Sequence, residues 1–210
     1  MVVEVRNGSG SIRMLGAACF ATGLGFAAPA LAEAECADEV RALMQGTGPH
    51  QGPVRSRSLT RMTGGMEMVS LGLTEGKNHL TMDADGNPVS LFRDAKFYTT
   101  SDAGETWTLV QTYSAETMEQ TRQGLAKQAA QARNITCEYG LDLDGNRVNY
   151  YTVDYEMHGT GTPMQGKYWV DAETGFALKA ITTSDPGGNE TVIEQVNEPA
   201  PGETIPSPDE

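Results

Sequence analysis

The sequence predicts an α+β protein in which two helices accompany an antiparallel sheet. Short segments rich in β-branched and aromatic residues follow one another from Val54 to Val110 and again from Glu138 to Asn197. Turns such as Asp85-Gly86-Asn87 separate them, and turns of this kind connect antiparallel hairpins. A helical segment, Ser114 to Arg133, stands between the two sets. The predicted order is therefore helix, strand meander, helix, strand meander.

Each predicted helix has its own signal. In Ala34 to Gln45, the apolar positions Cys36, Val40, Leu43 and Met44 recur at helical spacing. In Ser114 to Arg133, the serine can cap the first turn, acidic residues follow it, and the arginine lies near the negative end. The apolar stripe of this second helix is thin and mostly alanine, so we expect it to lie against the sheet while contributing little core.

The predicted strands are read from alternating or β-rich runs between turn residues. They are "VRSRSLTRMT" (54–63), "MEMVSLGL" (66–73), "NHLTMD" (78–83), "PVSLF" (88–92), "KFYTTS" (96–101), "ETWTLV" (105–110), "EYGLDL" (138–143), "NRVNYYTVDYEM" (146–157), "MQGKYWVD" (164–171), "FALKAITTS" (176–184) and "NETVIEQVN" (189–197).

Residues 1–32 are predicted to be a secretory signal peptide. Arg6 and Arg13 precede the apolar run "MLGAACFATGLGFAAPALA", and Ala30-Leu31-Ala32 forms a cleavage site before Glu33. A membrane anchor is the alternative, but the apolar core from Leu15 to Phe26 is shorter than the ~20 residues of a spanning helix. We therefore expect a periplasmic protein with one domain, residues 33–197, and a Pro-rich acidic tail, 198–210, that is extended or disordered.

The net charge of the chain limits the classes of partner that we expect. Its 15 Lys and Arg residues stand against 28 Asp and Glu, a formal net charge of −13. Removal of the signal peptide makes this −14, because Glu4, Arg6 and Arg13 leave with it. Such a balance disfavours nucleic acid and anionic membrane surfaces as partners and favours a soluble monomer.

Two of the three cysteines remain after cleavage, because Cys19 lies in the signal peptide. Export to an oxidising compartment predicts a disulfide between Cys36 and Cys137. The alternative is a pair of buried free thiols.

Motifs for catalysis or metal binding are missing from the sequence. There is no Gly-x-Ser-x-Gly elbow, phosphate loop or dinucleotide fingerprint. The turns "DADGNPVS" and "DLDGNRVN" place glycine fourth, whereas a calcium loop places it sixth. Asp171 and Glu173 could suggest a carboxylate pair for glycoside hydrolysis, but "VDAETGF" is better explained as a hairpin turn. We therefore predict no enzyme activity, no cofactor and no metal.

Two further patterns suggest binding surfaces. Arg55, Arg57 and Arg61 share one face of a predicted strand, which indicates either a docking strip for an anionic partner or a solvent-facing strand with ion pairs. Aromatic and methionine residues also gather on single strand faces. They form either an ordinary core or an adaptable ligand cavity, whose candidate lining is Met66, Met68, Trp107, Leu109, Met118, Leu125, Tyr151, Tyr155 and Trp169.

The order of elements, with "VSLFRDAKFYTTSDAGETWTLV", "YYTVDYEM", "GKYWVDAETGFALKA" and "TVIEQV", resembles the LolA-type periplasmic carriers and their lipoprotein relatives. Trp169-Val170-Asp171, Thr174-Gly175 and Leu178 are similar to a strand-turn-strand that recurs in that family, with Ala177 in place of its proline. The cysteine pair and the single long inserted helix depart from the family pattern.

The resemblance implies a strongly curved antiparallel sheet, an incomplete β-barrel, with one N-terminal helix and one long inserted helix packed on its open side. It also implies a non-enzymatic carrier for an acyl chain or another apolar, lipid-like ligand, held under the Ser114 to Arg133 helix, in lipid or lipoprotein trafficking and outer-membrane biogenesis. The alternative function is an envelope sensor or assembly module that binds a protein partner through the same fold.

Overall fold

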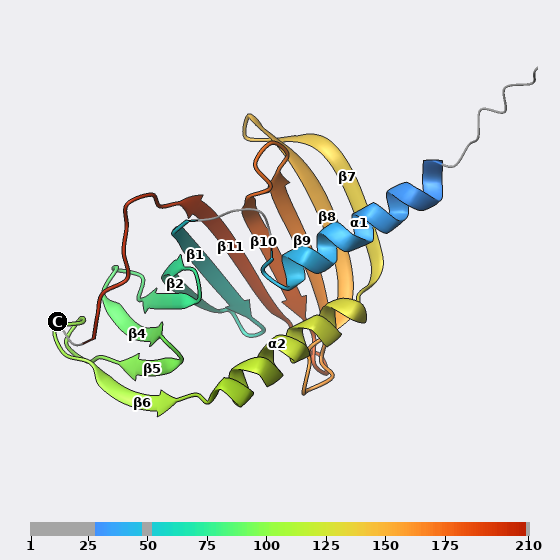
Figure 1. Cartoon of the computed structure of the whole chain (residues 1–210). Coiled ribbons are helices and arrows are strands. Elements are labelled where there is room, and N and C mark those ends of the chain that lie inside the picture. The colour runs from blue at the N-terminus through green and yellow to red at the C-terminus, as the bar shows by residue number, and fades with distance from the viewer. Residues whose placement is uncertain (1–27, 48–51, 209–210) are drawn as a thin grey trace, which may run out of the picture.

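The computed structural model describes residues 28–47 and 52–208. These residues form two helices and eleven strands. The strands make one antiparallel sheet, and both helices lie on the same side of it (Figure 1). The elements are α1 (Ala28–Met44), β1 (Val54–Met62), β2 (Met66–Glu75), β3 (Asn78–Met82), β4 (Pro88–Arg93), β5 (Lys96–Thr99), β6 (Thr108–Thr112), α2 (Ala115–Ala130), β7 (Arg133–Leu143), β8 (Asn146–Glu156), β9 (Pro163–Asp171), β10 (Ala177–Ser184) and β11 (Thr191–Pro199).

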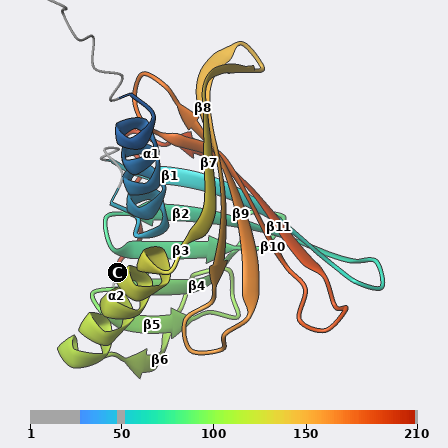
Figure 2. The ribbon, with the colours of Figure 1, turned by 90° about the vertical axis from the view of Figure 1, so that its right-hand side faces the viewer.

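The strand order confirms the two predicted meanders and shows how they join. The order is β6-β5-β4-β3-β2-β1-β11-β10-β9-β8-β7, so each meander is a run of hairpins. The junction is the pairing of the first strand with the last, from Val54 opposite Pro199 to Met62 opposite Thr191. β6 and β7 are the free edges, so the sheet is curved but not closed, and β1–β6 run across the direction of β8 and β9 (Figure 2).

α1 covers one half of the concave face. The predicted disulfide between Cys36 and Cys137 is present, with 6.0 Å between the two Cα atoms, and it ties α1 to β7. Val40, which is fully buried, packs on Tyr151, Val153 and other apolar residues of β8 and β9. α1 begins at Ala28, before the predicted cleavage site, and the rest of the predicted signal peptide lies outside the described residues.

α2 crosses the open side of the half-barrel from the β6 edge to the β7 edge (Figure 1). The hydroxyl of Ser114 accepts a hydrogen bond from the Thr117 amide at 3.1 Å, which confirms the predicted cap. Only Gly124 and Ala129 are buried on this helix. A Cβ at Gly124 would lie 2.7 Å from the His158 ring, so glycine allows α2 to approach the β8–β9 turn. As expected from its thin apolar stripe, α2 contributes little core.

A second core lies on the opposite, convex face of the sheet. Leu73, Leu80 and Leu91 are buried there beneath Ala200 and Ile205 of the C-terminal segment. The Arg93 guanidinium donates to the carbonyls of Ile205 and Pro206 at 2.9 and 2.8 Å. The described part of the tail is thus extended, but it packs against β2–β5 instead of being disordered.

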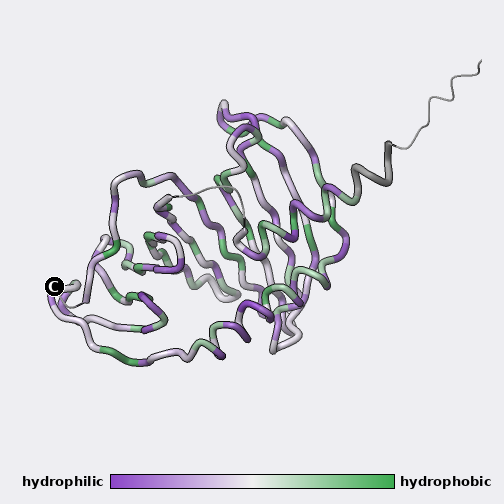
Figure 3. The backbone as a smooth tube through the Cα atoms, in the orientation of Figure 1, coloured by the Kyte–Doolittle hydropathy of each residue, from purple (hydrophilic) through white to green (hydrophobic). Residues whose placement is uncertain are grey.

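The predicted fold class is confirmed by this architecture. All eleven predicted strands are present, and most of their ends differ from the prediction by at most a few residues. The start of β7 was predicted wrongly: the strand begins at Arg133, the last residue of the segment predicted as helix, because α2 already ends at Ala130. Figure 3 shows the alternation of hydrophobic and hydrophilic residues along the strands. Among the described residues, neither helix combines the length and the apolar character that a membrane span requires.

Candidate functional site

Strand register sorts the residues of β1 and β2 onto two faces. Because side chains alternate along a strand, the even-numbered residues share one face and the odd-numbered residues share the other. On the odd face, Arg55 pairs with Glu203 of the tail at 2.6 Å, so this face is the convex one. On the even face, Ser56 lies opposite Gly72 and Ser58 opposite Ser70. The serines therefore face the concave side, toward the helices.

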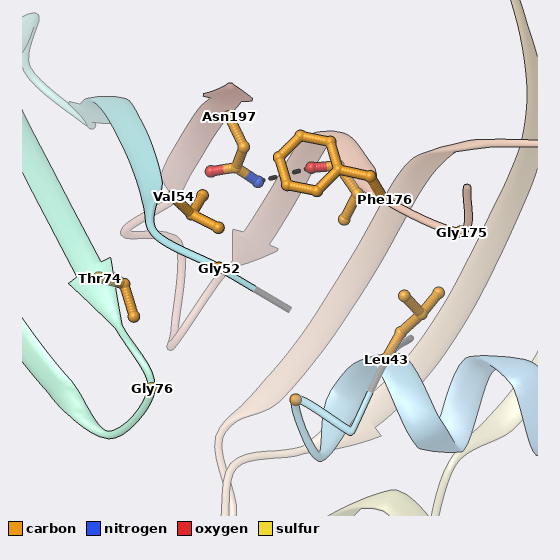
Figure 4. A pocket seen from close by; sticks show the side chains of 10 residues that line it. Leu43, Gly52, Val54, Thr74, Gly76, Gly175, Phe176 and Asn197 are labelled. Atoms are coloured by element: carbon orange, nitrogen blue, oxygen red, sulfur yellow. Dashed lines mark hydrogen bonds between the residues drawn. The ribbon is translucent and has the colours of Figure 1, made fainter. Parts of the chain in front are cut away.

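An apolar pocket of about 500 Å³ lies at the C-terminal end of α1 (Figure 4). Leu43 comes from α1, Val54 from β1, and Phe176 from the turn before β10. The Asn197 amide donates to the Ala177 carbonyl at 2.8 Å and so holds its polar group along the wall. The lining residues are Leu43, Gly46, Gly52, Val54, Thr74, Gly76, Gly175, Phe176, Ala177 and Asn197.

A second pocket of about 320 Å³ continues from the first along the concave face. The two share the lining residues Val54, Thr74 and Asn197, so they adjoin, and together they are called the trough below. Its floor is polar: Ser56, Ser58, Ser70, Thr81, His79 and Gln195 line it, together with Leu71, Gly72 and the three shared residues. The trough thus has an apolar end beside α1 and a polar end over β1–β3 and β11.

His79 lines the polar end, opposite Thr74 of β2. Its Nδ1 atom lies 2.8 Å from the Thr74 hydroxyl. A Cβ at Gly72 would lie 2.9 Å from the ring, so only glycine leaves room for the imidazole to lean across β2. Burial lowers the pKa of His79 below its ordinary value of 6.5, because the charged imidazolium would lose hydration. The ring is therefore neutral at neutral pH.

The trough carries no formal charge. Along β1, β2, β3 and β11, the concave positions hold Ser, Thr, Met, Val, Ile, Gly, Asn, Gln, Pro and the neutral His79. Every Lys, Arg, Asp and Glu within these four strands projects to the convex face. In a chain with a net charge of −13, this is a strong segregation of charge.

Glu39 anchors α1 beside a third pocket, of about 320 Å³, on the other side of Leu43. Its Oε2 accepts hydrogen bonds from the hydroxyls of Tyr139 and Tyr151, both at 3.0 Å. Burial and the Glu39 carboxylate raise the pKa of Tyr139 to about 12, and the same two causes raise that of Tyr151. Both phenols therefore remain protonated donors, which makes them a structural clamp on the helix.

The structure divides the predicted cavity residues between the two faces. Tyr151 and Tyr155 are buried under α1, whereas Met66 and Met68 are exposed at the far end of the concave face. Trp107 packs on the convex core, and Trp169 stacks near Tyr150 and the Lys179 ammonium on the convex side. Leu109 on the β6 edge and Leu125 on α2 are exposed, and Met118 is half-buried.

None of these nine residues lines the trough, which lies beside the end of α1 and not under α2. The nine predicted residues are large apolar or aromatic side chains. Most residues of its polar end are small and polar, and a serine strand face is normally solvent-exposed, so composition gave no signal for this site. Glycine at position 72 inside a strand was the one available hint of a close approach.

The predicted arginine strip is largely engaged in ion pairs. Arg55 contacts Glu203, and Arg61 contacts Glu67 and Glu194 at 3.1 and 3.4 Å. Arg57 is exposed and makes no ion pair within the part of the chain that the structure describes. The three side chains do share the convex face, but two of their charges are neutralised within the molecule.

Asp171 and Glu173 occupy the β9–β10 turn. The Asp171 Oδ1 atom accepts from the amides of Glu173 and Thr174 and from the Thr174 hydroxyl. These bonds lower the pKa of Asp171, the Thr174 hydroxyl being the largest cause. This carboxylate caps a turn, as predicted. In residues 28–47 and 52–208, no cluster of His, Cys, Asp and Glu could hold a metal ion.

No protein-family model matches the chain, and no curated protein matches it in sequence. Several solved structures are similar to it in three dimensions. The lipoprotein LppX of Mycobacterium tuberculosis is 13% identical with a TM-score of 0.49, over 81% of this chain and 100% of LppX. A LolA superfamily protein of Nitrosomonas europaea is 11% identical with a TM-score of 0.32, over 82% of this chain and 94% of that one.

A third similar structure is the MucA/MucB complex of Pseudomonas aeruginosa, 10% identical with a TM-score of 0.41, over 80% of this chain and 59% of the matched chain. At such identities and TM-scores, the likeness concerns the arrangement of strands and helices, and no ligand or partner is transferred from these proteins.

Proposed function

We propose that this protein is a non-enzymatic binding protein of the periplasm that holds the acyl chain of a lipid-like ligand in the trough. The observation that carries the proposal is an uncharged concave hollow, apolar at one end, in a strongly acidic chain. Its apolar end, about 500 Å³, lies within the ~300–1,000 Å³ range of small-molecule sites.

The apolar end suits an alkyl chain for two reasons. Leu43, Val54 and Phe176 offer apolar surface without an ionised group, so burying a methylene there gains about 0.8 kcal/mol with no charge to desolvate. The hollow also opens onto the concave face, so a chain can enter without unfolding of the sheet. The resemblance of the sequence to the LolA-type carriers supports a role in lipid or lipoprotein trafficking. It also supports a place in the periplasm, after export directed by the signal peptide.

The test is a titration with a fluorescent fatty acid, together with solvent extraction and mass spectrometry of the purified mature protein. Ser58→Tyr places a ring in the trough and should weaken binding at least about tenfold, a change of ~1.4 kcal/mol. Arg57→Tyr is the matched control, because the neighbouring residue faces away from the trough and makes no ion pair in the described structure. Absence of both copurifying lipid and saturable binding would rule the proposal out.

The second candidate is an envelope sensor or assembly module whose partner contacts the convex face at Arg57. This residue is exposed beside Val196, itself 45% exposed, and its charge is uncompensated by an ion pair in the described residues. Arg57→Glu tests this function without breaking the ion pairs of Arg55 and Arg61. If the set of proteins retained by the immobilised variant equals that of the wild type, this function is excluded.

A further inference from the structure

Four hydroxyl groups at the polar end of the trough make no hydrogen bond to any part of the chain that the structure describes. Ser56, Ser58, Ser70 and Thr81 are half-buried, yet their side chains make no hydrogen bond within the described residues. They come from three adjacent strands and line the same hollow. Buried polar groups are normally hydrogen-bonded. Because these four hydroxyls are only half-buried and line the hollow, they are available to water or to a ligand.

His79 adds a further unused group. Its Nδ1 is engaged by Thr74, whereas its Nε2 has no hydrogen-bond partner in the described part of the chain. The imidazole ring and the Ser56 hydroxyl converge above Gly72, since a Cβ there would lie 2.9 and 2.6 Å from them. A neutral imidazole nitrogen can donate or accept according to its tautomer. The polar end therefore offers both kinds of hydrogen-bonding group.

The absence of charge at this end selects against ionic ligands. A phosphate or carboxylate placed over Ser58 and Ser70 would lose hydration without a lysine or arginine to compensate it. Arg55, Arg57 and Arg61 lie on the other face of the same strand. An ammonium group would likewise find no carboxylate among the residues that line the polar end.

We infer that the trough selects a neutral, single-chain amphiphile. The acyl chain lies against Leu43 and Val54, and a head bearing hydroxyl or ester oxygens hydrogen-bonds to Ser58, Ser70 and His79. This inference rests on the proposed function, since it identifies the class of lipid that the same hollow takes. It goes further in assigning the preference to the head group and to particular hydroxyls.

The experiment compares three ligands with the same sixteen-carbon chain: monopalmitoylglycerol, palmitate and palmitoyl-lysophosphatidylglycerol. Each competes against a neutral fluorescent monoacylglycerol, below its critical micelle concentration. Monopalmitoylglycerol should displace the probe at a concentration at least about tenfold lower than either anion, because only it places no charge over the uncharged floor.

Ser58→Ala combined with Ser70→Ala tests the assigned hydroxyls. The double variant should reduce the preference for monopalmitoylglycerol about tenfold, since two hydrogen bonds to the head are removed. Thr183→Ala is the control. It deletes a hydroxyl from the convex face of the sheet, on β10, away from the trough, and it should keep the wild-type preference. Circular dichroism and the unfolding midpoint report whether each variant is folded.

The outcomes separate this inference from the proposed function. Equal displacement by all three ligands, or a preference that survives in the double alanine variant, overturns the head-group selection while acyl binding stands. If the fluorescent probe shows no saturable binding to the wild-type protein, and palmitate shows none either, the proposed function and this inference fall together.

Discussion

Gly72 shows how one residue shapes the candidate site. Its backbone is ordinary strand, so glycine is required there by space and not by conformation. Any side chain would meet the Ser56 hydroxyl and the His79 ring at under 3 Å. Filling this point would force both groups to move, and overpacking of this kind typically costs about 1–3 kcal/mol. The polar end of the trough therefore depends on the absence of a side chain.

His79 should make stability depend on pH between about 5.5 and 7.5. Its pKa in the folded protein lies below the ordinary 6.5 because burial disfavours the imidazolium. As the pH falls through 6.5, the unfolded chain takes up a proton that the folded protein does not, so the free energy of unfolding falls. This contribution is complete above 6.5 and is lost as the pH drops toward the folded pKa.

Urea denaturation at pH 7.5 and pH 5.5 would measure this slope in the wild type and in His79→Gln. The variant should be less sensitive to pH over that window. The carboxylates with lowered pKa values do not interfere, because those of Asp102 and Glu119, both about 2, and of Asp171 all lie at more acidic pH. An unchanged slope in His79→Gln would contradict the assignment.

At the scale of elements, the Cys36–Cys137 disulfide helps to fix the position of α1 on the sheet. The helix contacts the sheet through Val40, the Glu39 clamp and the disulfide to β7. Leu43 at its end closes the apolar pocket. Loss of the bond should therefore affect both the stability of the fold and the wall of the trough.

Replacing both cysteines by serine should lower the free energy of unfolding by about 4 kcal/mol. The bond joins residues 101 positions apart, and a loop of that length carries a large entropy in the unfolded chain. Guanidinium unfolding of the double variant, compared with oxidised and reduced wild type, measures the effect. Reduced wild type should match the variant; a loss below about 1 kcal/mol in both would show that α1 is held by packing alone.

At the scale of the whole molecule, the two halves of the sheet are covered on opposite faces. α1 and α2 cover the concave face over β7–β9, whereas the tail covers the convex face over β2–β5. The trough lies on the concave face of β1–β3 and β11, beside the end of α1. The position of the trough is thus set by which parts of the sheet the helices and the tail cover.

This arrangement predicts that the tail is part of the fold. Ile205 is 4% exposed on the convex core, so Ile205→Ala should cost about 2–4 kcal/mol. Ile193→Ala is the matched control: Ile193 is 37% exposed on the concave face, and its truncation should cost less than about 1 kcal/mol. Thermal or urea unfolding compares the two. Equal, small effects would mean that the tail is not anchored.

Much of the fold could be predicted because its signals are local. Ser114 caps α2, Asp171 caps the β9–β10 turn, and alternation places the strands to within a few residues. The two cysteines remaining after export predict the disulfide. The candidate site could not be predicted in the same way, because the trough combines small polar residues of β1, β2, β3 and β11 that are up to 141 positions apart, as Ser56 and Asn197 show.

The sequence by itself determined which residues share a face of each strand, because side chains alternate with a period of two. It therefore places Ser56, Ser58 and Thr60 on one face of β1 and Arg55, Arg57 and Arg61 on the other. Only the tertiary structure decided that the serine face is concave and open and that the arginine face meets the tail. The reason is physical: alternation is a local property, whereas the curvature of the sheet and its coverings arise from the β1–β11 pairing, the disulfide and the packing of Ile205.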